Sequence, residues 1–134
     1  MRRPRGWSDG CTRWGGVNFR EFLDEFRTTV EGTLAVTLIG TDGIPIDTVA
    51  SEGLPLETIS AELTSFLKGL RLSNTELDTG DVRQISVMTD RYTSVLSKVT
   101  SDYFLLVILS PDGNYGRARF ELAKAKFKLQ DELI

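Results

Sequence analysis

The sequence predicts an α+β sandwich in which three helices cover a five-stranded antiparallel sheet. Three segments have apolar residues at helical spacing, five others have the alternating or continuous apolar runs of strands, and the links between successive strands are short. Short links make neighbouring strands antiparallel, and the apolar faces of the helices must then cover the sheet. The expected order of elements is α-β-β-α-β-β-β-α. With 134 residues, the chain is long enough for one domain with its own core.

The first expected helix lies between Asn18 and Gly32. Its apolar residues recur at helical spacing, and charged residues occupy the other faces. They are Phe19, Phe22, Leu23, Phe26 and Val30. Asn18 is the expected N-cap and Gly32 the expected stop.

A hairpin is expected next, with strands at Thr33–Gly40 and Ile44–Ala50. Asp42-Gly43 between them could be a tight turn or part of a metal site. Asp42 and Asp47 here, like Asp78 and Asp81 further on, lack the ligand density of a calcium loop. Aspartate and glycine readily adopt the positive φ angles of hairpin turns, so we expect a turn and no metal site.

The second helix is expected to start at Gly53-Leu54-Pro55 and to end before a polar loop at Asn74–Asp81. Its apolar stripe comprises Leu56, Ile59, Leu63, Phe66, Leu67 and Leu70. A second line of small residues comprises Ser60, Ala61, Thr64 and Ser65. Small side chains allow another backbone to come close, so this line is either a contact between helices or an ordinary solvated face.

Three strands and a helix complete the expected order. The strands are predicted at Val82–Asp90, Arg91–Thr100 and Tyr103–Leu109. The last of them is continuously apolar, which is typical of a central strand covered on both faces. A turn at Pro111-Asp112-Gly113 precedes the final helix, predicted from about Asn114 to Leu133. The apolar stripe of that helix comprises Tyr115, Ala118, Leu122, Ala125, Leu129 and Leu133.

The charge is distributed unevenly along the chain. Residues 1–18 carry four arginines, at positions 2, 3, 5 and 13, against Asp9, so their net charge is +3 and the remainder, 19–134, carries −6 of the total of −3. An acidic body argues against nucleic acid as the main partner. We expect the arginine-rich segment to be a flexible extension, with contact to nucleic acid or anionic lipid as the alternative.

The composition also bears on the compartment. Cys11 is the single cysteine, so an internal disulfide is excluded and a reducing cytoplasm is the expected compartment. No apolar run approaches the roughly 20 residues of a membrane span, and no apolar segment of a secretory signal follows the basic start.

The residue inventory argues against an enzyme. The chain has no histidine, which excludes a Ser-His-Asp triad and removes the commonest general base and nitrogen ligand for metals. Ser97 and Lys98 are neighbours, but their side chains would point to opposite faces of a strand. The "GTDGIP" segment lacks the spacing and the lysine of a phosphate-binding loop. We therefore expect no catalytic, cofactor or metal site, and a binding or assembly module.

Two segments resemble the Roadblock (dynein light chain) family. They are "EGTLAVTLIGTDGIPIDTVAS", which is similar to the first hairpin of that family, and "DYFLLVILSPDGNYGRARFELAKAKFKLQDEL", which is similar to its last strand and helix. The resemblance spans about Phe19 to Leu133, so that 19–134 is the expected domain. It implies a profilin-like sandwich with strand order 2-1-5-4-3, one helix on one face and two on the other.

The resemblance also implies a homodimer, in which third strands pair and second helices lie side by side. The interface residues would be Ser60, Ala61, Thr64, Ser65, Ile85 and Val87. Bacterial MglB-type members are homodimers that bind a small Ras-like GTPase and can accelerate its GTP hydrolysis. Their docking platform includes the paired second helices, so the GTPase-contact candidates are Glu57, Glu62, Lys68 and Arg71.

Two other functions stay open. The same fold could serve as a structural light chain or adaptor of a motor or polarity complex. A profilin-like or PAS-like architecture could instead sense a small ligand or act on it, which would require a pocket with convergent polar groups. The inward positions of the predicted strands are almost all aliphatic.

Overall fold

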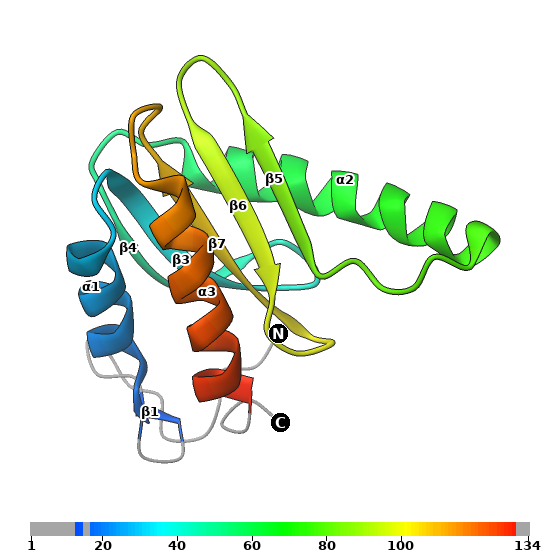
Figure 1. Ribbon diagram of the computed structural model, residues 1–134, viewed down its shortest axis with the longest axis horizontal. Helices are drawn as coiled ribbons and strands as arrows, with labels where there is room; N and C mark the ends of the chain where they lie inside the picture. The colour runs from blue at the N-terminus through cyan, green and yellow to red at the C-terminus, as the bar shows by residue number, and fades with distance from the viewer. Residues whose placement is uncertain (1–12, 15–16, 131–134) are drawn as a thin grey trace.

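The computed structural model describes residues 13–14 and 17–130 of the chain. Its main sheet has five antiparallel strands in the order β4-β3-β7-β6-β5. These strands are β3 (Thr33–Gly40), β4 (Pro45–Ala50), β5 (Gln84–Met88), β6 (Thr93–Lys98) and β7 (Tyr103–Leu109). Helices α1 (Phe19–Thr29) and α3 (Tyr115–Gln130) cover one face, and α2 (Leu56–Leu77) lies behind the other (Figure 1). The predicted class and strand order are confirmed, and the element order is as predicted from α1 onward.

Strand β7 occupies the centre of the sheet, as its continuous apolar run predicts. Val107 of β7 lies opposite Val36 of β3 on one side and Val95 of β6 on the other. The strand is buried from Phe104 to Leu109, because side chains alternate between the two faces and helices cover both.

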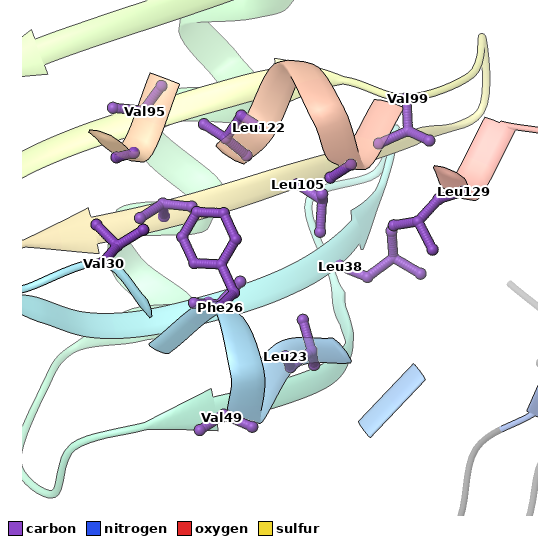
Figure 2. Close-up of a cluster of buried hydrophobic side chains, with 14 of the residues drawn as sticks. Leu23, Phe26, Val30, Leu38, Val49, Val95, Val99, Leu105, Leu122 and Leu129 are labelled. Carbon is purple, nitrogen blue, oxygen red and sulfur yellow. The ribbon is translucent and has the colours of Figure 1, made fainter. Parts of the chain in front are cut away.

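Two apolar clusters result from this alternation. Leu105, Val107 and Leu109 of β7 belong to the cluster under α1 and α3. Figure 2 shows that cluster, where Leu23 and Phe26 of α1 and residues of α3 approach the sheet from the same side. Phe104, Leu106 and Ile108 belong to the cluster under α2. Both faces of the central strands β3, β6 and β7 are therefore covered, whereas Gln84, Ser86 and Met88 of the edge strand β5 stay exposed.

The turn at Asp42-Gly43 is confirmed, and it packs against α2. Asp42 Oδ1 accepts a hydrogen bond from the backbone N–H of Ile44 at 3.0 Å, and Gly43 has φ +82°. A Cβ added to Gly43 would lie 2.7 Å from Thr64 Oγ1. Glycine is therefore needed for both its backbone angle and the close approach of α2.

Helix α2 is longer than predicted. It continues to Leu77 rather than ending at Asn74, and it stops where Asp78 adopts the left-handed φ of 54°. Polar residues such as Asn74 and Thr75 disfavour helix only weakly, whereas a left-handed residue is a common helix terminus. Strand β5 is correspondingly shorter than the predicted Val82–Asp90.

Two short strands lie within the segment that was expected to be a flexible extension. Strands β1 (Arg13–Trp14) and β2 (Val17–Asn18) pair as a short antiparallel ladder directly before α1. The other three arginines of the extension, at positions 2, 3 and 5, and Cys11 lie outside the described residues, as does Leu133 near the other end.

Candidate functional site

The outward surface of α2 is the candidate site, and it differs from the predicted line of small residues. Ser60 and Thr64 are buried, at 0% and 4% exposure, while Ala61 and Ser65 are exposed. Because each residue advances about 100° around a helix, neighbours in the sequence such as Ser60 and Ala61 point to different faces of α2. Thr64 Oγ1 donates a hydrogen bond to the backbone oxygen of Ser60 at 2.8 Å. Ser60 and Thr64 therefore support the helix from inside.

The exposed small residues form a different line. They recur at every fourth position, as Ala61, Ser65, Gly69 and Ser73. A Cβ added to Gly69 would meet nothing within 4 Å, so the surface there is open. Gly69 and Ser73 were not predicted, although the four-residue spacing from Ala61 is a signal that could have found them.

Large apolar side chains flank this line. Phe66, predicted for the core stripe, is 57% exposed, and Leu72 is 72% exposed. A surface hollow of about 530 Å³ is lined by Glu62, Ser65, Phe66, Gly69, Leu70 and Ser73. Exposed apolar residues beside a hollow are typical of a protein-interaction surface rather than of a catalytic cleft.

The second half of α2 extends past the edge strand β5 (Figure 1). Among the described strands, β5 pairs only with β6, so its other edge carries unpaired backbone groups. Ile85 is 8% exposed and, like the partly buried Val87, packs into the α2-side cluster. These two predicted interface residues point inward, so a neighbour would meet the backbone of β5 and the exposed side chains of Gln84, Ser86 and Met88.

The predicted charged contact residues have different environments. Glu57, Glu62 and Lys68 are exposed on α2. Arg71 is half-buried, with its guanidinium carbon 5.3 Å from the ring centroid of Phe104. A cation over a buried aromatic ring stabilises the fold. Arg71 therefore contacts the core, whereas the other three candidates face solvent.

We expect Ser60→Ala to raise the free energy of unfolding by about 1 kcal/mol, because the buried Ser60 hydroxyl has no hydrogen-bond partner in the described structure. Chemical denaturation measures the change. Ser65→Ala on the exposed face is the matched control, which reports helix propensity alone. An equal change in both variants, or destabilisation by Ser60→Ala, would contradict this assignment.

Residues 13–14 and 17–130 contain no group of three or more His, Cys, Asp or Glu side chains arranged to bind a metal ion. None of the helices in these ranges is long and apolar enough to cross a bilayer. The features that the described residues do provide are the helix surface of α2 and the unpaired edge of β5.

Solved structures similar to this chain identify its family. No family model and no curated protein matches the sequence. MglC from Myxococcus xanthus is 35% identical, over 85% of this chain and 98% of that chain, with a TM-score of 0.60. A Roadblock/LC7 domain from Streptomyces avermitilis is 19% identical, over 84% and 95% of the two chains, with a TM-score of 0.74. The gliding protein MglB from Thermus thermophilus is 14% identical, over 92% and 96%, with a TM-score of 0.74. The chain belongs to the Roadblock/LC7 family, and its structure is similar to those of MglC and MglB.

Proposed function

We propose that this chain is a non-catalytic homodimeric module that binds a small Ras-like GTPase in the cytoplasm and regulates or scaffolds it. The outward surface of α2 carries the proposal, with its line of small residues between Phe66 and Leu72. The similarity to MglC and to the gliding protein MglB supports a regulatory role of this kind.

The proposed dimer pairs two β5 edges and places two α2 helices side by side. Small residues at four-residue spacing allow helices to approach closely, and exposed Phe66 and Leu72 gain most from being covered. A two-fold axis would use the same surface on both copies. Pairing of the strand edges would also satisfy the backbone groups of β5, which otherwise form a template for aggregation. We expect a buried area of about 1,200–2,000 Å² or more.

The proposed GTPase contact lies around this dimer interface. Glu57, Glu62 and Lys68 would form a polar rim, which is the usual surrounding of an apolar interface centre. Arg71 would act indirectly, by holding α2 against Phe104. We propose that any acceleration of GTP hydrolysis would come from repositioning the GTPase's own residues, as the family resemblance implies for MglB-type members.

Affinity capture from the source cell's lysate, with a non-hydrolysable GTP analogue or with GDP, tests the proposal. We expect a Ras-like GTPase to be retained preferentially with the analogue. In titrations with the purified GTPase, Glu62→Arg and Lys68→Glu should each weaken binding by about tenfold. Lys126→Glu, on α3 across the sheet, is the matched control and should leave the affinity unchanged.

Retention of structural proteins regardless of nucleotide would contradict the GTPase proposal and favour an adaptor of a motor or polarity complex. Loss of GTPase binding in the Lys126→Glu control would place the contact on the other side of the sheet. Hydrolysis assays on the purified pair would then separate a GTPase activator from a scaffold that only binds.

A further inference from the structure

Helix α3 has two apolar lines on opposite sides. One, made of Ala118, Leu122, Ala125 and Leu129, is buried against the sheet. The other recurs at the same spacing on the solvent side, as Gly116, Phe120, Ala123 and Phe127. Phe120 is 57% exposed and Phe127 is 79% exposed. A helix that only covers a sheet needs apolar residues on its buried side alone. The exposed apolar residues of α3 therefore require another explanation.

Basic side chains border the exposed line on both sides. Arg117, Lys124 and Lys128 lie on the side of α1, where they line a groove of about 270 Å³ between the two helices. Arg119 and Lys126 follow the other side of the line at helical spacing. Glu121 is the one carboxylate among the described residues of α3, and Glu25 of α1 also lines the groove. The five cations therefore form a local positive surface on a chain whose net charge is −3.

Several of these cations lie against aromatic rings. The Arg117 guanidinium carbon and Lys124 Nζ are 5.8 Å and 5.5 Å from the Phe120 ring centroid. The same two side chains contact Glu121 at 3.1 Å and 3.6 Å. Cations held over rings in this way place positive charge directly beside the apolar line. The surface is therefore complementary to a ligand with an apolar centre and acidic borders.

We propose that the outer face of α3 docks an acidic amphipathic helix from a partner protein, with Phe120 and Phe127 as apolar anchors. These two residues are seven positions apart, about 10 Å along the helix axis, which matches the anchor spacing of a docked helix. The surface lies across the sheet from α2 (Figure 1), so the proposal goes beyond the GTPase-binding function and does not depend on it.

The charges around α3 favour this occupant over a membrane or a second copy. Helix α1 covers the same sheet face and exposes Glu21, Asp24 and Glu25, which an anionic bilayer would repel. The two arginines of α1 are engaged elsewhere, Arg20 with Asp47 at 3.0 Å and Arg27 with Ser51 at 3.2 Å. Two α3 helices laid against each other would bring five cations against five. A narrow helix laid along Phe120 and Phe127 would cover α3 rather than the acidic face of α1, of which only Glu25 lines the groove between the two helices.

Fluorescence anisotropy with the full chain and a labelled amphipathic peptide of about 18 residues tests the proposal. The peptide has leucine at i, i+3, i+4 and i+7 and glutamate on both borders. Two reference peptides contain the same residues in scrambled order, or lysine in place of glutamate. We expect the acidic amphipathic peptide to bind at least about tenfold more tightly than either, and the affinity to fall as salt rises.

Phe120→Ala and Phe127→Ala should each weaken peptide binding by about tenfold. Phe66→Ala is the matched control, because Phe66 on α2 has the same 57% exposure as Phe120. Equal binding of the scrambled peptide, or unchanged affinity in Phe120→Ala, would overturn the proposal. Tighter binding to phosphatidylserine vesicles than to the peptide would overturn it in favour of a membrane. Ser65→Arg on α2 should disrupt the proposed dimer but leave peptide binding unchanged. The docking proposal and the dimer proposal can therefore fail independently.

Discussion

Phe104→Ala is expected to lower the free energy of unfolding by about 3–5 kcal/mol. Phe104 is 1% exposed in the cluster under α2, and the Arg71 guanidinium carbon lies 5.3 Å from its ring centroid. Truncation leaves a cavity in the central strand and removes the aromatic partner of a half-buried cation. Because domains of this kind are stable by roughly 5–15 kcal/mol, the loss would be a large fraction of the total.

Urea denaturation at a fixed protein concentration measures this change, since dimerisation would add to the apparent stability. Phe120→Ala removes the same side chain from a 57% exposed position and should cost less than about 1 kcal/mol. Similar losses in the two variants would contradict the assignment of Phe104 as a packing centre.

Ser65→Arg is expected to raise the dissociation constant of the proposed dimer by at least about 100-fold. Ser65 is exposed in the line of small residues on α2, beside Gly69 and Phe66. In a two-fold arrangement each substitution occurs twice, so both bulk and like charge are introduced where two helices must approach. Thr64, which is 4% exposed, is unsuitable for this test because an arginine there would disrupt the fold itself.

Light scattering after size exclusion measures the mass, which should be about 30 kDa for the wild type, twice the 14.9 kDa of one chain. The Ser65→Arg protein should elute at the mass of one chain. Ala123→Arg places the same residue on exposed α3 and should leave the dimer intact. A wild-type monomer, or a Ser65→Arg dimer, would refute the interface on α2.

The fold was predictable because its signals are local. The continuous run Tyr103–Leu109 indicated a strand covered on both faces, and it is the central strand. Thr33–Gly40 was predicted with its observed bounds, because Gly32 and the Asp42-Gly43 turn bracket it closely. The strand order came from the family resemblance, since hairpin-length links fix which strands are adjacent only within each hairpin.

The candidate site was less predictable, because exposure depends on what a helix packs against. Phe66 fits the apolar stripe of α2 by spacing, yet it is 57% exposed. The helix buries the face that carries Leu63 and Leu67, and Phe66 lies about 100° around the helix from Leu67. Arg71 reads as a surface cation in the sequence, and only the fold places it over Phe104. The exposed apolar line with Phe120 and Phe127 was not predicted from the sequence. The residues that α3 buries against the sheet already account for the helical pattern of that segment.

The position of β7 has a consequence for protein synthesis. The strand lies between the hairpins β3–β4 and β5–β6, which within the sheet are joined to each other only through it. Because β7 is the last strand to leave the ribosome, both hairpins must exist for a time without their shared partner. Isolated hairpins are marginally stable in water and expose apolar faces. Folding of the sheet is therefore deferred until β7 has left the ribosome, and until then the nascent hairpins are exposed to misassociation.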